Sequence, residues 1–292
     1  MSETSAEPRL KVLTGIDLTE RSRNAFARAV ELVRSPGAHL TLLHVTSDAL
    51  PSQVAAVHEG YAQEVLQDLA AKARVEGAAH VDTIGVRGRD YETLIAEARK
   101  THADLIVIGT HRPSSLMQDM LGTTADRVLR LGGLPVLLVR SKPEGAYRSI
   151  LVAVDFSPAS HRALERAVRW FPTARITAVT AYGTARRSLL GDDAEVREAA
   201  AETRRLALKG FLDEVREALG PGHESAIANV VPVVERGWAE DVILKCAQET
   251  KPDLIVVGTH ARGGLQHAVL GSVAQWVLTE APCDVLAVPP AS

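Results

Sequence analysis

DLIVIGTHRPSSLMQDMLGTTADRVL, residues 104–129, recurs at residues 253–278 as DLIVVGTHARGGLQHAVLGSVAQWVL, and this pair of segments decides the fold. From position 104 to position 253 the offset is 149 residues, and 13 of the 26 aligned positions are identical without a gap. Nearer the start, KVLTGIDLTERSRNAFARAVEL aligns with SILVAVDFSPASHRALERAVRW, which places Asp17 opposite Asp155. The chain is therefore an internal duplication of one unit.

Each copy is expected to alternate strands with helices. In the first copy we expect strands at residues 11–16, 40–45, 80–86, 105–108 and 136–139, and helices at 22–33, 54–75, 91–101 and 123–131. In the second copy we expect strands at residues 150–154, 176–181, 229–234, 254–257 and 285–288. Strands such as LIVI and LIVV are apolar on both faces, which is typical of parallel strands covered on both sides. We therefore expect an α/β fold of two tandem doubly wound domains, each with a five-stranded parallel sheet flanked by helices.

A linker is expected at SKPEGAY, residues 141–147, because this segment combines proline, glycine and charge. The first domain is then expected at residues 1–141 and the second at residues 147–292. The chain has 292 residues, of which 46% are hydrophobic and 24% charged, so each half is long enough to bury its own core.

Charge and cysteine content narrow the class of protein. A formal net charge of −3 argues against a surface for nucleic acid or anionic membranes, since both usually leave a basic excess. The two cysteines, Cys246 and Cys283, are far apart and form no CxxC pair, which fits a reducing compartment. The first residues resemble no secretory signal, and no apolar stretch is long enough to span a membrane. We expect a cytoplasmic protein that binds neither nucleic acid nor membrane.

A ligand would lie beyond the carboxyl ends of the strands, where the strand order of an open parallel sheet reverses. Asp17 and Asp155 follow the first strand of their copies, and Gly109 and Gly258 end the fourth. An alternative role for both aspartates is the N-cap of the helix that follows.

An anion is favoured where the last helix of the second copy begins. A helix starting at Ser272 presents unpaired backbone N–H groups and the positive end of its dipole, and Gly271 before it lets the backbone approach a phosphate. The alternative is that Gly271-Ser272 forms only a helix cap with its preceding turn. Gly122-Thr123 is the corresponding pair in the first copy.

These segments resemble the universal stress protein family in its tandem form, over about residues 10–289. The family's nucleotide signature is Gly, two residues, Gly, nine residues, then Gly-Ser or Gly-Thr. In the second copy the matching residues are Gly258, Ala261 and, after nine residues, Gly271-Ser272; in the first they are Gly109, Arg112 and Gly122-Thr123. In ATP-binding members the first-strand aspartate and a backbone group at the end of the second strand contact adenosine.

The resemblance implies contacts with an adenine nucleotide, ATP or AMP, with or without Mg²⁺. In the second copy the implied contacts are Asp155, Ala181, Gly258, Ala261, Gly263, Gly264, Gly271 and Ser272. In the first copy the weaker matches are Asp17, Val45, Gly109, Gly122 and Thr123.

The two copies depart from the signature to different degrees. Ala261 adds only a methyl group at the middle glycine, whereas Arg112 is bulky and is followed by Pro113, which fixes φ and removes a donor. Ser114-Ser115 also replaces the Gly263-Gly264 pair. We expect the second copy to bind nucleotide and the first to be degenerate or weaker.

Three functions stay open at this point. The leading one is a stress-response protein that binds adenine nucleotide and acts as a sensor or an interaction module. The others are a nucleotide-free interaction module with a vestigial pocket, and a weak ATPase. The Walker GxxxxGK[ST] and GxSxG motifs are missing and the histidines are scattered, so we name no catalytic residue and expect no metal site. Pairing through the last strands predicts a homodimer or an intrachain pseudo-dimer. The role as an interaction module also implies a protein partner, which the sequence does not identify.

Overall fold

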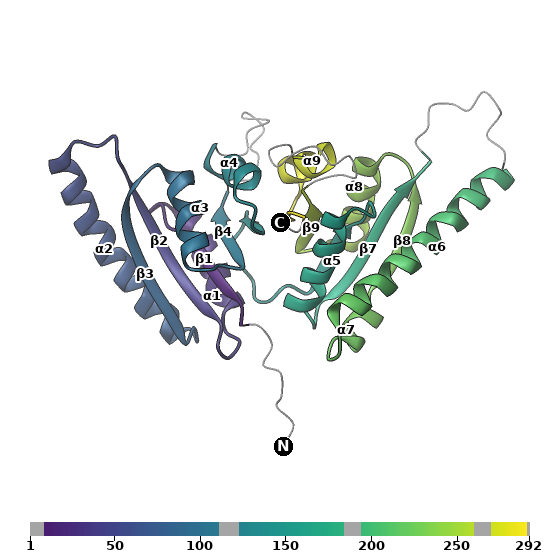
Figure 1. Ribbon diagram of the computed structural model, residues 1–292, viewed down its shortest axis with the longest axis horizontal. Helices are drawn as coiled ribbons and strands as arrows, with labels where there is room; N and C mark the ends of the chain where they lie inside the picture. The colour runs from purple at the N-terminus through teal and green to yellow at the C-terminus, as the bar shows by residue number, and fades with distance from the viewer. Residues whose placement is uncertain (1–8, 111–122, 184–193, 260–269, 291–292) are drawn as a thin grey trace, which may run out of the picture. The chain divides into compact units, whose positions relative to one another are not determined.

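A computed structural model of the chain describes residues 9–110, 123–183, 194–259 and 270–290. The chain divides into two compact units, Met1–Ala146 and Tyr147–Ser292 (Figure 1).

The first unit alternates five strands with four helices within the described residues. Its elements are β1 (Lys11–Gly15), α1 (Glu20–Leu32), β2 (His39–Ser47), α2 (Ser52–Val75), β3 (His80–Gly88), α3 (Asp90–Lys100), β4 (Leu105–Gly109), α4 (Thr123–Leu131) and β5 (Val136–Val139). All four strand pairs of this unit are parallel, and the strand order is β3-β2-β1-β4-β5.

The second unit repeats this plan with one additional short helix. Its elements are β6 (Ser149–Ala153), α5 (Pro158–Trp170), β7 (Arg175–Tyr182), α6 (Ala194–Leu219), α7 (Glu224–Ala228), β8 (Val231–Arg236), α8 (Ala239–Thr250), β9 (Leu254–Gly258), α9 (Ser272–Glu280) and β10 (Asp284–Val288). The strand order β10-β9-β6-β7-β8 is again all parallel. The predicted α/β class with two five-stranded, doubly wound sheets is confirmed.

The predicted start of the third strand of the second unit is two residues too early. We expected a strand from Asn229, but the strand β8 begins at Val231, and the short helix α7 ends just before it at Ala228. The continuous apolar run around Val230 does not show where helical backbone gives way to extended backbone.

Helices cover both faces of each sheet. In the second unit α5 packs against α6 and against β9, while α8 packs against α9 and against β6 and β7. The central strands are buried on both sides: Leu151, Val152, Leu254 and Val256 are each essentially inaccessible to solvent. This burial explains why these strands are apolar without alternation.

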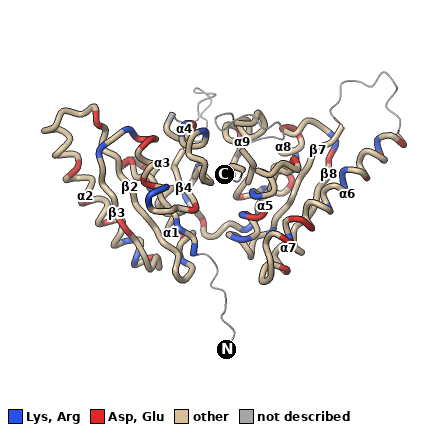
Figure 2. Tube along the Cα trace, viewed as in Figure 1, with Lys and Arg blue, Asp and Glu red and all other residues tan. Residues whose placement is uncertain are grey.

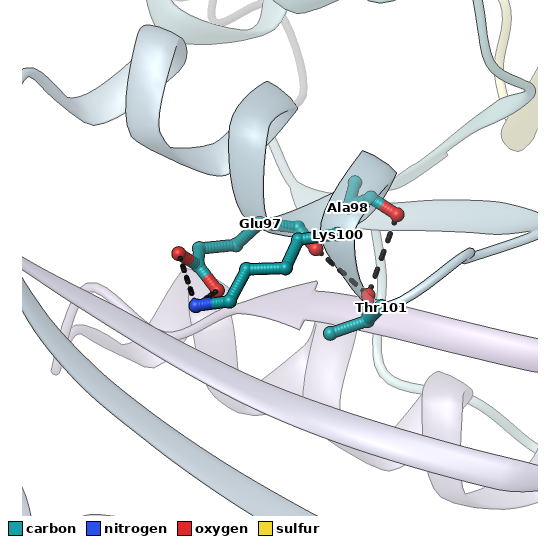
Figure 3. A network of polar contacts seen from close by, with 4 residues as sticks. All are labelled: Glu97, Ala98, Lys100 and Thr101. Atoms are coloured by element: carbon teal, nitrogen blue, oxygen red, sulfur yellow. Dashed lines mark hydrogen bonds and ion pairs between the residues drawn. The ribbon is translucent and has the colours of Figure 1, made fainter.

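The C-terminus of α3 shows how the repeated sequence fixes a helix end (Figure 3). The Thr101 hydroxyl donates to the carbonyls of Glu97 and Ala98 over 2.8 and 3.3 Å, and Lys100 pairs with the Glu97 carboxylate. At the equivalent position in α8, the Thr250 hydroxyl donates to the Cys246 carbonyl over 2.7 Å. In α3 the hydroxyl adds to the backbone bonds of the last turn, because the Glu97 and Ala98 carbonyls also accept the N–H groups of Thr101 and Ala103 over 2.9 and 2.8 Å.

Charged residues of both signs alternate along the long helix α6 (Figure 2). On α6, for example, the Arg205 guanidinium lies 2.8 Å from Glu198 and 3.1 Å from Glu202, with all three side chains about half exposed or more. No helix among the described residues is long and apolar enough to cross a membrane.

Candidate functional site

A pocket in the second unit lies beyond the carboxyl ends of β6, β7 and β9. It is a cavity of about 110 Å³ whose lining includes Ala153 from β6, Ala181 from β7, Gly258 from β9 and Ser272 from α9. Since β6 lies between β7 and β9, the order of the chain reverses here. The pocket therefore occupies the switch point at which open parallel sheets bind ligands.

The structure brings together five of the eight residues expected in the second copy: Asp155, Ala181, Gly258, Gly271 and Ser272 all line this pocket. Ala261, Gly263 and Gly264 lie outside the described residues. The sequence pattern did not indicate the apolar inner wall of the pocket, which is formed by Val179, Val242, Ile243 and Val257. The 3.6-residue periodicity of α8 could have shown that Val242 and Ile243 face inward, but it does not show which end of the sheet they cover.

Gly258 has a packing role that does not depend on a ligand. A Cβ at Gly258 would lie 2.7 Å from the backbone nitrogen of Ser160 and 2.8 Å from the backbone carbon of Ala159. In the first unit a Cβ at Gly109 would lie 2.2 Å from the Arg21 carbonyl oxygen. Both glycines therefore let the fourth strand approach the first helix of the unit.

The N-terminus of α9 forms the polar side of the pocket. Gly271 is the N-cap of this helix, and its own N–H already donates to the carbonyl of Thr259 over 2.8 Å. Helix α9 then begins at Ser272, and Val273 and Ala274 of its first turn also line the pocket. The donors that a helix N-terminus offers to an anion therefore come from the residues after Gly271.

Asp155 and Asp17 shape the turn before the first helix of their units but are not its N-caps. Ser157 is the N-cap of α5, and Asp155 Oδ1 accepts the Ser157 N–H over 3.0 Å. Thr19 is the N-cap of α1, and Asp17 Oδ1 accepts both its N–H, at 2.9 Å, and its hydroxyl, at 2.6 Å. The N-cap alternative for the two aspartates is therefore wrong, because each binds the cap residue itself.

Both turns contain a residue in the left-handed region. Phe156 follows Asp155 with φ 63°, and Leu18 follows Asp17 with φ 61°. For a side chain larger than glycine this conformation costs of order 1–2 kcal/mol, so the surrounding hydrogen bonds must hold it. The same turn, with its left-handed residue and its aspartate, therefore recurs in both copies.

The charge state of Asp17 follows from these contacts. Burial raises the pKa of its carboxyl, but the hydrogen bonds from Thr19 and the charge of Arg21 outweigh this effect. The pKa of Asp17 is therefore held below its ordinary value, and the carboxylate is ionised at neutral pH.

The Ala181 carbonyl accepts hydrogen bonds from an arginine that no sequence motif indicates. The Arg204 guanidinium, on α6, donates to the Ala181 carbonyl through Nε at 3.1 Å and Nη2 at 2.7 Å. Its Cζ also lies 4.6 Å from the centre of the Phe156 ring. An arginine thus binds at the edge of the pocket.

In the first unit the predicted residues occupy equivalent elements. Asp17 follows β1, Val45 lies near the end of β2, half-buried, and Gly109 ends β4. Thr123 begins α4, whereas Gly122 lies outside the described residues. The end of β1 is also packed differently, because Gly15 stands where β6 has Ala153 and a Cβ there would lie 3.2 Å from Leu94.

Metal ligands do not gather in the part of the chain that the structure describes. Within it, no group of three or more His, Cys, Asp or Glu side chains could hold a metal ion. The buried His44 ring instead contacts the Ile16 carbonyl through Nδ1 at 2.7 Å and lies 5.2 Å from the His58 ring.

Comparison with known proteins identifies the family. The universal stress protein family matches residues 8–140 and again residues 146–289. A universal stress protein of Mycolicibacterium smegmatis is 27% identical over 297 residues, which cover 96% of this chain and 97% of that protein.

Two solved structures are also similar. A universal stress protein from Archaeoglobus fulgidus superimposes with a TM-score of 0.72 at 20% identity, covering 96% of this chain and 98% of its own, and shares the fold. A universal stress protein in complex with cAMP matches 46% of this chain and 98% of its own, with 22% identity and a TM-score of 0.38. With two matches of the family along its length, this chain belongs to the universal stress protein family, in its tandem form.

Proposed function

We propose that this protein binds an adenine nucleotide, ATP or AMP, in its second unit and acts in the stress response as a sensor or interaction module. The observation that supports this proposal is the pocket at the switch point, where an apolar wall faces the N-terminus of α9. Such a pocket combines a surface for a flat heterocycle with a site for an anion.

The apolar side of the pocket suits the base. Val179, Val242, Ile243 and Val257 present aliphatic surface on which a purine ring can be buried. Ligand pockets usually measure about 300–1,000 Å³. At about 110 Å³, the cavity has room for the base, and the sugar and phosphates would extend from it toward solvent.

The polar side suits the sugar and the phosphates. The Asp155 carboxylate is exposed at the end of β6 and can accept hydrogen bonds from ribose hydroxyls. Ser272 is exposed at the first position of α9, where its hydroxyl and the first-turn N–H groups can donate to phosphate oxygens. Mg²⁺ would enter the site bound to the phosphates of the nucleotide.

We propose further that the two domains, at residues 1–141 and 147–292, differ in ligand. Arg112-Pro113 in the first copy replaces the more permissive Ala261-Arg262 of the second. The first domain then keeps the fold and binds nucleotide weakly or not at all. Asp17, Val45, Gly109, Gly122 and Thr123 would form only this weaker site.

The test is isothermal titration of the full chain with ATP and with AMP. We expect one site per chain. Asp155→Asn should weaken binding about tenfold, because it removes a charged acceptor while retaining an oxygen for the Ser157 N–H. Asp17→Asn is the matched control from the duplicate and should leave the affinity unchanged. Two sites of equal affinity, or loss of binding in Asp17→Asn alone, would contradict the proposal that the second domain is the main nucleotide site.

The two alternative functions give different outcomes. A vestigial pocket predicts no heat of binding at millimolar nucleotide and no nucleotide adduct in native mass spectrometry. A weak ATPase predicts phosphate release at stoichiometric protein that is lost in Gly271→Asp, since a carboxylate at the α9 N-terminus would repel phosphate.

We also propose that the protein acts in the cytoplasm, as a homodimer or through pairing of its own halves, and signals to a protein partner. Cell fractionation tests the location. Light scattering with and without ATP tests the oligomeric state, because a sensor must bind nucleotide differently in its two states.

A further inference from the structure

The Arg204 guanidinium is held by two independent contacts at the edge of the pocket. Its Nε and Nη2 atoms donate to the Ala181 carbonyl at 3.1 and 2.7 Å, and its Cζ lies 4.6 Å from the centre of the Phe156 ring. A charged donor and a cation–π contact each stabilise this position, so the guanidinium is fixed in place.

The Ala181 carbonyl faces the pocket side of β7. The Val179 carbonyl accepts the Val154 N–H over 2.8 Å and so points toward β6. The Tyr182 carbonyl accepts the Gly237 N–H over 3.1 Å and points the other way, toward β8. Because carbonyls alternate along a strand, the Ala181 carbonyl points toward the β6 side, beyond the last residue of β6.

A heterocycle in this pocket would therefore lie near a carbonyl, that of Ala181, which already accepts hydrogen bonds from Arg204. Its faces would lie on the aliphatic side chains, and its edge would lie near the Ala181 peptide group. A ring amino group could donate to the Ala181 carbonyl, but the Arg204 guanidinium already donates to that carbonyl through Nε and Nη2. A ring carbonyl at the same place has no hydrogen to donate, so it loses no hydrogen bond when the Ala181 carbonyl is occupied.

We infer that Arg204 is a specificity-determining residue, which lowers the affinity of the pocket for 6-amino purines relative to 6-oxo purines by occupying the Ala181 carbonyl. The inference rests on the proposed function, because it requires a purine base in this pocket. Adenine nucleotide then binds in competition with the protein's own arginine, more weakly than the pocket alone would allow.

The experiment compares AMP with IMP, which differ only in the amino or oxo group at position 6. Affinities are measured by titration for the wild type and for Arg204→Met, which keeps an apolar stem beside Phe156 and removes the donors. We expect Arg204→Met to raise the AMP-to-IMP affinity ratio about tenfold, through tighter AMP and unchanged or weaker IMP. Arg205→Met is the matched control, since Arg205 is exposed and pairs with Glu198 and Glu202.

Each other outcome overturns the inference. An unchanged or lower ratio in Arg204→Met means that the guanidinium does not discriminate at position 6. An equal gain for both nucleotides means that it only obstructs the pocket. If the wild type binds AMP and the ratio is unchanged, the inference fails and the proposed function stands. If neither nucleotide binds any variant, while circular dichroism shows all of them folded, both fail.

Discussion

Gly258 and Ser160 approach so closely that a Cβ built on Gly258 would lie 2.7 Å from the backbone nitrogen of Ser160. The atom it would meet belongs to the backbone of α5, within a turn that Ser157 fixes by accepting the Ser160 N–H over 3.1 Å. Neither strand nor helix can yield easily at this point, so the first glycine of the nucleotide signature also sets the spacing between β9 and α5.

The first prediction concerns this contact. Gly258→Ala should lower the free energy of unfolding by about 2–3 kcal/mol, because the methyl group overlaps rigid backbone. Urea unfolding of the full chain measures the loss, and binding of nucleotide is not needed to see it. A variant as stable as the wild type would show that β9 and α5 can separate, and that the glycine is needed for a ligand alone.

The second prediction uses a glycine with open space around it. Gly210 lies within α6, and apart from the backbone of this helix no atom of the described residues lies within 4 Å of a Cβ built there. Gly210→Ala should raise the free energy of unfolding by about 0.5–1 kcal/mol, since alanine restricts the unfolded chain and favours helix. The same urea titration checks it, and a loss of stability would mean that the exposed side of α6 is in contact with another surface.

The third prediction concerns pH. The pKa of Asp17 in the folded protein lies below its ordinary value of 3.8, so the ionised carboxylate stabilises the fold above that value. This contribution is lost as the pH falls through the lowered pKa. Asp17→Asn should therefore cost about 1 kcal/mol or less at pH 7, and the difference from the wild type should shrink as the pH falls below 3.8.

Urea unfolding across this range measures the difference between wild type and Asp17→Asn. Thr19→Val removes the hydroxyl donor at 2.6 Å and should reproduce part of the same pH dependence. A difference that stays constant or grows in acid would show that the carboxylate charge does not stabilise this turn.

The sequence predicted the elements and one edge of the site because both follow from local pattern. The repeated apolar runs located the strands, and chain order alone places Asp155 and Gly258 at the same edge of a doubly wound sheet. The Ser157-Pro158 pair is also a local helix-start signal, with proline in the first turn, and reading it would have corrected the N-cap assignment.

The remaining contacts depend on how whole helices dock. Arg204 lies 23 residues beyond Ala181, within a helix of 26 residues on which many charged side chains face solvent. Nothing in the local sequence distinguishes Arg204, which reaches the strand end, from Arg205, which pairs with exposed glutamates. Only the position of α6 against β7 decides this, and that position is a property of tertiary packing.

The fourth prediction concerns the start of the second unit, where the Tyr147 hydroxyl donates to Asp284 Oδ2 over 2.6 Å. Both residues are buried, and the Tyr147 ring also meets Phe171 edge-on at 5.3 Å. Tyr147→Phe keeps the ring contact and removes a donor to a buried carboxylate, so it should cost about 1.5–3 kcal/mol of unfolding free energy. Tyr61→Phe is the control, because the Tyr61 side chain is exposed and should change stability by less than about 0.5 kcal/mol. Equal stabilities for the two variants in urea would mean that the buried carboxylate does not depend on Tyr147.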